Sequence, residues 1–337
     1  MNWYLQNGKN SDVVMSSGVK LSRNIAKYPF ITKCSEEDLK KICEEVKEIA
    51  PSLGYGLEYI SLSDIDDITK LSLVEKHIVS PEFIVKNNKC KGILINSEEN
   101  ICIMINNEDH IEIQVFSSGE DLENLINLAV EIDEKLGELL TYSYSKQFGF
   151  LTVSPTNVGT GMKARVTVHL PALTLTGNIG KILRIVNNFN MSIQGIYGEN
   201  TINRGDMYFI SNNQTLGLTE KETIKNIKTI SLKVIEQERL ARKNLTKTPI
   251  ELEDKVYRSY GILTNAKQLG AEECNELLSD IKMGVDLGII KELDDTKVRE
   301  LVLYTKPGNL QKYVGKQLDG YEKEIKRAEV VKQVLAS

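Results

Sequence analysis

The sequence KARVTVHL at residues 163–170 decides how the middle of the chain folds, because apolar and polar side chains alternate along its whole length. Successive side chains of a β-strand point to opposite faces. The apolar set therefore faces a core, and the polar set, which begins with Lys163 and Arg165, faces the other way. Residues 111–115 repeat the pattern with Glu112 and Gln114 on the polar side. The two strands are predicted to form the floor of a polar cleft; the alternative is a sheet face that is simply solvated.

The region before this strand is predicted to form an antiparallel sheet. Short apolar runs at residues 92–95, 101–105 and 111–115 are separated by turns of hairpin length. Helical spacing of apolar residues on both sides of these runs, at 35–49 and 121–140, predicts amphipathic helices. The fold class is therefore α+β, with helices that cover one face of the sheet.

The end of the chain is predicted to be helical. Thr219 and Glu222 form the capping pattern that starts a long helix, and Pro249 is typical of the boundary behind it. We expect two domains, residues 1–248 and a small all-helical domain at residues 249–337. A length of 337 residues fits two domains.

The amino-acid composition limits the classes of protein to which this chain can belong. Hydrophobic residues make up 41% and charged residues 26%, which is typical of a folded globular protein. The net charge of −5 favours neither nucleic acid nor an anionic membrane as a partner. The N-terminus lacks the apolar run of a signal peptide, and no stretch is apolar enough to span a bilayer, so a cytoplasmic protein is expected.

Cysteine and histidine usage argues against a metal site. The five cysteines form no CxxC pair and are expected to be reduced thiols. Only three histidines are present, so acid–base chemistry would depend on carboxylates. We expect no protein-bound metal.

The loop SPTNVGTGMK at residues 154–163 contains two glycines and leads directly into the strand. Its backbone amides could hold a phosphate. It lacks the spacing and the following helix of a Walker A loop, however. A structural turn is therefore the favoured interpretation of the loop taken alone.

Further motifs make the interpretation more specific: SSGVKLSRN at 16–24, NNEDH at 106–110 and GIYGE at 195–199. With them the sequence resembles the ATP:guanido phosphotransferases. It looks most like the bacterial protein-arginine kinases, because HLPAL at 169–173, IEQER at 235–239 and the helical tail also match. The resemblance covers essentially the whole chain. It implies a guanido-kinase-type catalytic domain, in which helices flank an antiparallel sheet, and a helical domain that helps to bind protein substrate and phosphoarginine.

The resemblance also implies roles for individual residues. Transfer of the γ-phosphoryl group of ATP to a guanidinium depends on positioning and on charge stabilisation by Mg²⁺ and arginines. Glu108 and Glu199 occupy the positions of two carboxylates that orient the guanidinium; the alternative is that both persist as structural partners of buried amides. Ser154 stands where the family commonly has a reactive cysteine. Gly159 belongs to the phosphate loop.

The phosphate clamp differs most from the family pattern. Its five arginines are expected at positions that here carry Gly18, Lys20, Glu112, Lys163 and Gln194. Two lysines and one glutamate leave a net side-chain charge of +1 at these positions, where five arginines would give +5. Lysine supplies charge without the planar fork that binds phosphate bidentately.

These departures predict a pseudokinase or a strongly impaired kinase that acts by binding, with no cofactor of its own. The alternative is an active ATP-dependent protein-arginine kinase that uses Mg²⁺, in which Arg23 and Arg165 help the two lysines to rebuild the clamp. A kinase for small guanidino metabolites is the least favoured choice, because the tail matches the protein-directed branch.

The tail suggests a second site and a set of partners. Lys323, Glu324 and Arg327 stand in the motif that the family associates with phosphoarginine, and a solvated charged helix face is the alternative. The resemblance implies arginine side chains of proteins as the ligand. It also implies a zinc-finger activator, a Clp-type AAA+ unfoldase, a heat-shock repressor or an active paralogue as partners in stress response and proteolysis. A homodimer is expected, without nucleic acid or membrane.

Overall fold

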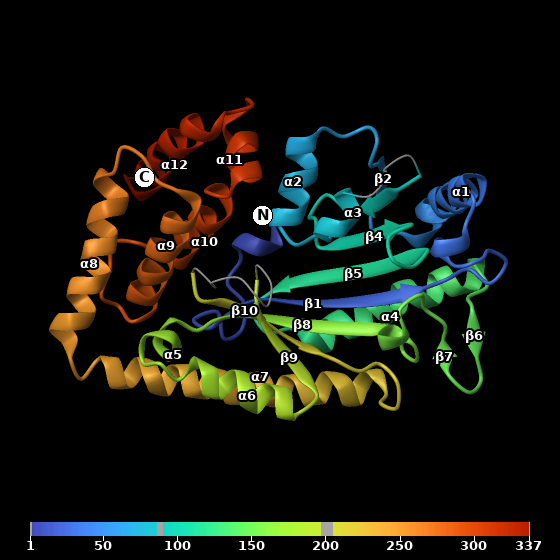
Figure 1. Ribbon diagram of the computed structural model, residues 1–337, viewed down its shortest axis with the longest axis horizontal. Coiled ribbons are helices and arrows are strands. Elements are labelled where there is room, and N and C mark those ends of the chain that lie inside the picture. Colours follow the sequence, from blue (N-terminus) through green and yellow to red (C-terminus); the bar gives the residue numbers. More distant parts are fainter. Residues whose placement is uncertain (1, 86–89, 197–204, 337) are drawn as a thin grey trace.

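The structure, a computed structural model, describes residues 2–85, 90–196 and 205–336. In this part of the chain, eight antiparallel strands form one sheet in the order β2-β3-β4-β5-β1-β8-β10-β9 (Figure 1). The strands are β1 Val14–Arg23, β2 Glu58–Ser61, β3 Gly92–Ile95, β4 Ile101–Ile105, β5 Ile111–Ser118, β8 Met162–His169, β9 Met191–Gly195 and β10 Met207–Asn212. The small hairpin of β6 (Tyr144–Ser145) and β7 (Gly149–Phe150) is separate. The predicted antiparallel meander is confirmed as β3, β4 and β5.

The alternation predicted for residues 163–170 is also confirmed. Ala164, Val166 and Val168 are completely buried in the main core. Strand β8 pairs with β1 in a register that sets Lys163 opposite Lys20. The polar side chains of both strands therefore share the other face of the sheet.

Helices cover the apolar face, as expected. They are α1 Glu36–Leu53, α4 Leu122–Leu139, α6 Ile179–Asn188 and α7 Glu220–Leu245 (Figure 1). Two of them begin with the capping boxes that the sequence predicts, Ser35 with Asp38 and Thr219 with Glu222. Each box satisfies backbone amides that have no partner within the helix.

The opposite face is divided into two parts. Over β3 and β4, a second core packs around Phe83 and Trp3. It is formed by the 3₁₀ helix Trp3–Leu5 and by α2 (Asp67–Glu75) and α3 (Pro81–Val85). The remaining part of this face, over β1, β8 and β10, stays free for a cleft. Three short elements complete the first part of the chain: the 3₁₀ helices Ile31–Lys33 and Pro155–Asn157, and α5 (Pro171–Leu175).

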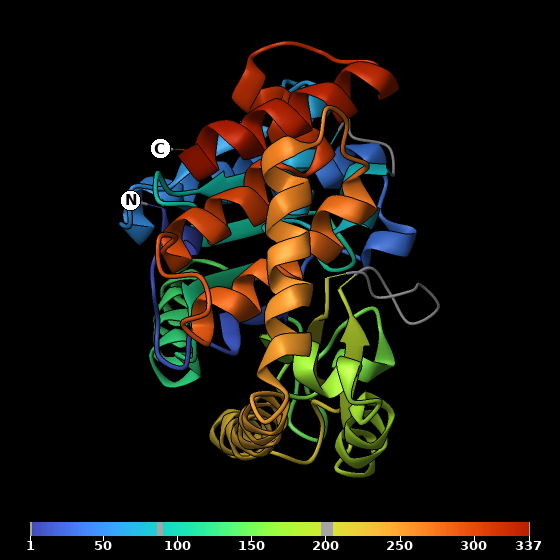
Figure 2. The same ribbon diagram turned by 90° about the vertical axis from the view of Figure 1, so that its left-hand side faces the viewer.

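The C-terminal region is helical and has a core of its own, which extends from Val256 to Val334. Its helices are α8 Pro249–Asn265, α9 Ala271–Asp286, α10 Asp295–Tyr304, α11 Pro307–Val314 and α12 Gly320–Ala336. Figure 2 shows α8 rising from the end of α7 and carrying the chain away from the sheet. The predicted α+β fold with a helical C-terminal region is confirmed.

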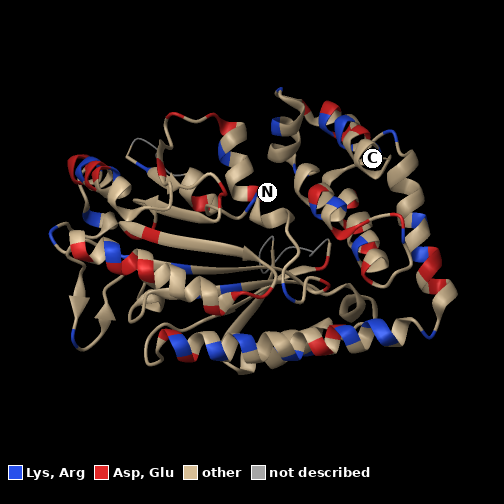
Figure 3. Ribbon diagram, turned by 180° about the vertical axis from the view of Figure 1, so that it is seen from behind, with Lys and Arg blue, Asp and Glu red and all other residues tan. Residues whose placement is uncertain are grey.

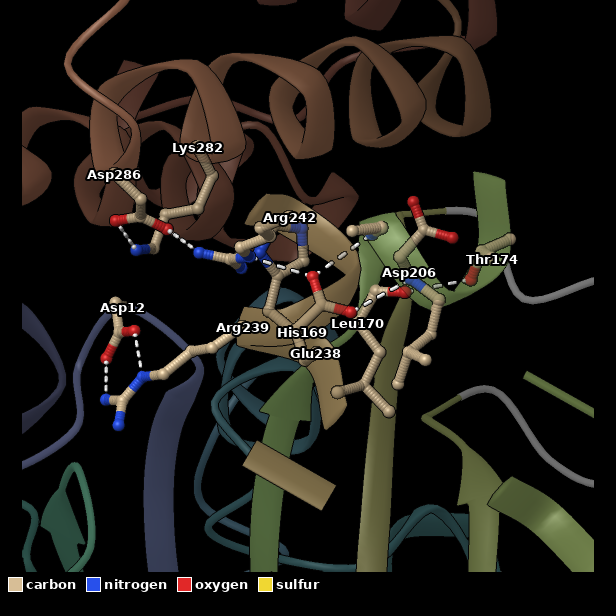
Figure 4. Close-up of polar contacts among 12 residues, drawn as sticks. Asp12, His169, Leu170, Thr174, Asp206, Glu238, Arg239, Arg242, Lys282 and Asp286 are labelled. Carbon is tan, nitrogen blue, oxygen red and sulfur yellow. Dashed lines mark hydrogen bonds and ion pairs between the residues drawn. The ribbon is translucent and has the colours of Figure 1, made fainter. Parts of the chain in front are cut away.

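A buried ionic network joins the two regions (Figure 4). On α7, Glu238 accepts a hydrogen bond of 2.8 Å from Arg242 and two more from backbone amides at the start of α5. Arg242 also contacts Asp286 of α9 at 3.1 Å, and Lys282 contacts the same carboxylate at 2.6 Å. Because these charged groups are almost fully buried, separating the regions would leave unpaired charges in apolar surroundings.

Charge on the outer helices follows the usual pattern of solvated faces. Seen from behind, basic and acidic residues are intermingled along α7 and the C-terminal helices (Figure 3). Among the described residues, no helix is both long and apolar enough to cross a membrane.

One buried ion pair fixes the end of β1 to the helical layer. Arg23, only 2% exposed, donates hydrogen bonds of 3.0 and 2.6 Å to Asp133 of α4. The guanidinium also donates to the carbonyl oxygens of Ser22 and Thr160 and lies 3.5 Å from the ring centre of Phe150. Every side of this guanidinium is therefore occupied.

We predict that Asp133→Ala lowers the free energy of unfolding by about 3–5 kcal/mol, because it leaves the Arg23 guanidinium buried without its counter-charge. Equilibrium urea unfolding measures the effect. The double variant Arg23→Met with Asp133→Leu should be less destabilised than Asp133→Ala. As a control, Asp254→Ala removes an exposed pair with Arg258 and should change stability by less than about 0.5 kcal/mol. Equal losses at the two sites would contradict the prediction.

Candidate functional site

The polar face of β1, β5, β8, β9 and β10 forms the floor of a cleft of about 1040 Å³. The start of α9 and the segment from Thr305 to Pro307 contribute its other wall. The cleft predicted from strand alternation is therefore present. All five positions assigned to the phosphate clamp line it, namely Gly18, Lys20, Glu112, Lys163 and Gln194.

Lys20 and Glu112 form an ion pair on the floor of this cleft. The Lys20 ammonium lies 3.2 Å from Oε2 of Glu112, and the same oxygen accepts a hydrogen bond of 3.0 Å from Asn107. Glu112 is completely buried, and its Oε1 has no partner in the described part of the chain. The charge of Lys20 is thus neutralised where a phosphate oxygen would need it.

Lys163 is held by backbone carbonyl groups. Its ammonium donates to the carbonyl oxygens of Asn212 at 3.2 Å and Asn213 at 2.8 Å. Burial, together with the nearby charge of Lys20, lowers the pKa of Lys163 from its usual value. The charge of Lys163 is therefore only weakly compensated, but two carbonyl groups already hold its ammonium in place.

The two arginines expected to help the clamp lie on different faces of the sheet. Arg165 lines the cleft. Arg23 does not point into the cleft, so that expectation was wrong. Residue 23 falls on the apolar side of β1, where Asp133 of α4 binds its guanidinium.

The acidic motif at residues 106–110 is largely structural. Asp109 accepts hydrogen bonds from Asn24 at 2.6 Å and from the backbone N–H of Val153 at 2.8 Å. His110 Nδ1 accepts from the backbone N–H of Ile25, and burial lowers the pKa of this imidazole. These bonds tie the end of β1 to the hairpin that carries the motif.

Glu108 is the exposed member of that motif. Asn157 donates a hydrogen bond of 3.3 Å to one of its oxygens. Glu108, Asp109 and Glu112 each bring one carboxylate oxygen within 4.8 Å of the others. Among the described residues, this is where side chains could hold a hard cation such as Mg²⁺.

The glycine loop is a structural turn in this chain. The backbone amides of residues 157–160 all donate within the protein, including Gly159 to Phe150 and Thr160 to Thr215. Gly159 has a φ of +111°, and a Cβ there would lie 2.4 Å from the carbonyl oxygen of Thr215. The expectation that Gly159 cradles a phosphate is contradicted, because its N–H and those of the other three residues are already satisfied.

Two catalytic candidates remain to be placed. The Ser154 hydroxyl lies 2.8 Å from the Thr156 hydroxyl. The next residue along the chain, Asn157, is the one that donates a hydrogen bond to Glu108. Glu199 lies outside the described residues.

The tail motif is only partly available to a ligand. Arg327 is 2% exposed and donates to the carbonyl oxygens of Thr305 and Leu269, both at 2.7 Å. The backbone carbonyl of Glu324 accepts from the N–H of Leu269. Lys323 is half-buried. The expectation that Lys323 and Arg327 grip one phosphate between them is contradicted for Arg327, because its guanidinium holds the helical region together.

Sequence reasoning did not single out two residues of the cleft. His77, just after α2, and Lys306, just before α11, both line it. Neither belongs to a recognisable spacing pattern. Only the packing of the C-terminal helices against α2 brings them to the site.

Asp109 provides a pH test of this region. Burial, assisted by the charges of Glu112 and Glu108, raises its pKa from 3.8 to about 6. Since the folded-state pKa is the higher one, the destabilisation is absent below about pH 4, grows between pH 4 and 6, and is complete above pH 6. Asp109→Asn, which keeps the accepting oxygen, should therefore raise stability at pH 7, by up to roughly 3 kcal/mol.

Urea unfolding of Asp109→Asn and the unaltered chain between pH 4 and 8 would show the difference. The two should converge near pH 4. A constant difference across this range would mean that titration of Asp109 is not its source.

The comparisons with known proteins agree with this geometry. Residues 38–241 match the family model described as ATP:guanido phosphotransferase, C-terminal catalytic domain. Residues 249–337 match the protein-arginine kinase McsB C-terminal domain. The chain is 42% identical to a protein-arginine kinase of Halothermothrix orenii, over 98% of this chain and 95% of that one. The corresponding protein of Bacillus subtilis is 38% identical over 99% and 93% of the two chains.

Solved structures show the same fold. The duplicated taurocyamine kinase of Schistosoma mansoni superimposes with a TM-score of 0.59 at 25% identity, over 67% of this chain and 32% of that one. This chain thus spans about a third of that duplicated enzyme. Lombricine kinase gives a TM-score of 0.60 over 69% of this chain and 68% of that one. From the matches over both of its regions, the chain belongs to the protein-arginine kinases of the ATP:guanido phosphotransferase family.

Proposed function

We propose that this chain recognises arginine side chains of proteins and transfers phosphoryl groups to them very slowly or not at all. The protein substrate is supported by the relatives, which are named protein-arginine kinases and match over 98–99% of this chain. The weak transfer is supported by one observation above all, the ion pair between Lys20 and the completely buried Glu112 in the cleft.

Acidic groups near the cleft suit a guanidinium. Glu112 has a buried oxygen without a partner among the described residues, and Glu108 is exposed beside it. A carboxylate that accepts hydrogen bonds from a planar guanidinium forms one of the stronger polar contacts in proteins. An arginine side chain would thus gain a partner at the exposed Glu108, and the negative charge of the buried Glu112 would add to the attraction.

The same groups do not fit the phosphates of ATP. A cleft of about 1040 Å³ has room for a nucleotide. At the five clamp positions, however, Glu112 places a negative charge, Lys20 is neutralised by it, and Lys163 is tethered to two carbonyl groups. In phosphoryl-transfer enzymes, one transition-state arginine can contribute about 10³–10⁵ in rate. Without arginine at all five positions, we infer a severe loss of transfer.

An active ATP-dependent protein-arginine kinase with Mg²⁺ is the second candidate. It is favoured by the names of the relatives and by the identity of about 40% that spans both regions. On the floor of the cleft, Lys20, Lys163 and Arg165 are cations that could face a nucleotide, and Lys306 lines its other wall. In that case these three side chains would bind phosphate oxygens, and Mg²⁺ would supply the remaining positive charge.

The finer features that the resemblance implies are further proposals. They are a catalytic domain at residues 1–248, a substrate-binding domain at 249–337, a homodimer, a cytoplasmic location and a role in stress-linked proteolysis. The partners proposed on the same basis are an activator with a zinc finger, a Clp-type unfoldase, a heat-shock repressor or an active paralogue. A phosphoarginine site at Lys323 would have to work without the buried guanidinium of Arg327.

We predict that the purified chain, given Mg-ATP and an arginine-rich protein, forms at most a trace of phosphoarginine, because the clamp lacks the charge to bind and polarise the phosphates. Mass spectrometry under conditions that preserve the acid-labile product measures it. More than a trace from the folded chain would establish the second candidate instead.

A reconstructed clamp sharpens this experiment. A Cβ at position 18 would already lie 3.4 Å from Nε of Arg165. An arginine introduced at position 18 would therefore push against the Arg165 side chain, so the variant also replaces Arg165 by alanine. The variant combines Gly18→Arg, Lys20→Arg, Glu112→Arg, Lys163→Arg, Gln194→Arg and Arg165→Ala. It should form clearly more phosphoarginine than the unaltered chain. The same variant with Glu108→Gln is the control for the catalytic carboxylate and should return to the trace level.

A further inference from the structure

Arg165 is held in an unusual position at the centre of the cleft floor. It lies on β8, opposite Gly18 of β1 and Ser211 of β10. Its guanidinium carbon is 5.5 Å from the ring centre of Phe116 and 5.3 Å from that of Phe209. Nη2 donates a hydrogen bond of 2.8 Å to the carbonyl oxygen of His77. Two rings and one carbonyl group therefore fix the plane of the guanidinium in advance.

The absence of a side chain at Gly18 makes this position possible. A Cβ there would lie 3.2 Å from Cδ1 of Phe116 and 3.4 Å from Nε of Arg165. The contact with Phe116 is tighter than most that a real Cβ makes, and the one with Arg165 is at the lower limit of ordinary van der Waals contact. Any larger residue at position 18 would push against both the ring and the guanidinium.

Within residues 2–85, 90–196 and 205–336, no side chain neutralises the charge of Arg165. Among the described residues, no carboxylate forms an ion pair with it, and burial alone lowers its pKa to about 10. It therefore remains protonated near neutral pH. The side chain of Arg165 is half-buried. A partly desolvated charge without a counter-charge is unfavourable, and an anion that binds it would relieve that cost.

A second cation reaches the same place from the C-terminal region. The Lys306 ammonium donates to the carbonyl oxygen of Glu75 at 2.9 Å. Burial lowers the pKa of Lys306, and the negative charge of the Glu75 carboxylate opposes this shift. The Glu75 carboxylate itself accepts from the backbone N–H groups of Gly308 and Asn309 at the start of α11. The Glu75 carbonyl oxygen that binds Lys306 and the His77 carbonyl oxygen that binds Arg165 lie two residues apart in the chain, and both cations line the cleft.

We propose that Arg165 and Lys306, neither of which is one of the five clamp positions, form an anion site that binds a phosphoryl group within the same cleft. A guanidinium whose plane is fixed presents parallel N–H donors that match two phosphate oxygens. A nucleotide or a phosphorylated arginine could supply the group. Because the two cations belong to different regions, the bound anion would also link the sheet to the C-terminal helices. The site does not depend on the proposed function, since it needs no phosphoryl transfer.

Calorimetric titration of the full-length chain with inorganic phosphate, ADP and free phosphoarginine tests the site and separates the sources. We expect at least one of the three to bind, and Arg165→Gln to weaken the tightest of them by about tenfold or more. Arg165→Lys should recover only part of the affinity, because it retains the charge without the fork. Gly18→Ala should also weaken binding, although it removes no charge.

Two further variants locate the effect. Lys163→Gln changes a clamp position two residues away on the same face of β8, and it should cost clearly less affinity than Arg165→Gln. Arg184→Gln, on the exposed face of α6, is the surface control. Thermal unfolding of each variant without ligand shows whether it is folded.

The proposal is overturned if none of the three probes binds the unaltered chain at up to about 10 mM, a limit that corresponds to very weak affinity. It is also overturned if folded Arg165→Gln binds as tightly as the unaltered chain, or if Lys163→Gln costs as much affinity as Arg165→Gln. None of these results depends on phosphoarginine formation. Failure of this site and failure of the proposed function therefore remain distinguishable.

Discussion

The antiparallel pairing of β1 with β8 is the constraint on which the cleft depends. It sets Lys20 opposite Lys163 and Gly18 opposite Arg165. A shift by one residue would move the buried apolar side chains of both strands into the cleft and the charged ones into the core. The helices on the apolar face therefore hold the polar face in register. Strand β5 pairs with β1, and β10 pairs with β8. The positions of their cleft-facing residues therefore depend on the register between β1 and β8.

The face of the sheet on which each side chain lies explains why two arginines of this sheet have opposite roles. Arg23 faces the helical layer, where Asp133 and two carbonyl groups satisfy its guanidinium. Arg165 faces the cleft, where aromatic rings and one carbonyl group hold it without neutralising its charge. The first therefore stabilises the fold, and the second remains available to an anion. Arg327 and Lys306 differ in the same way: Arg327 is buried and stabilises the fold, whereas Lys306 lines the cleft and remains available to an anion.

The position of the C-terminal helices determines what the cleft contains. The network of Glu238, Arg242 and Asp286 fixes α9 against α7, and the Glu75 carboxylate satisfies the first amides of α11. The first contact is buried and the second is partly buried, so moving the helices away would leave several charged and polar groups without partners. The C-terminal region thus contributes a wall of the site and is not an appendage. On the other side of the cleft, Glu112 places a negative charge where the family pattern has an arginine. The cleft therefore carries charges of both signs, which is the basis for proposing that it binds guanidinium groups.

The sequence by itself determined the sheet, its covering helices and the helical C-terminal region, because apolar periodicity and capping boxes are local signals. It also placed Lys163 with Arg165, and Glu112 with Gln114, on the polar side of their strands, since alternation along a strand fixes the side of each residue. The pairing of the strands then brought the other clamp positions to the same face. Only the tertiary structure decided which cations remain unpaired. Arg23, Arg165 and Arg327 look alike in the sequence, but their partners lie at Asp133, at His77 and at Thr305, far away along the chain. Such partners are set by the packing of distant elements, and no local pattern encodes them.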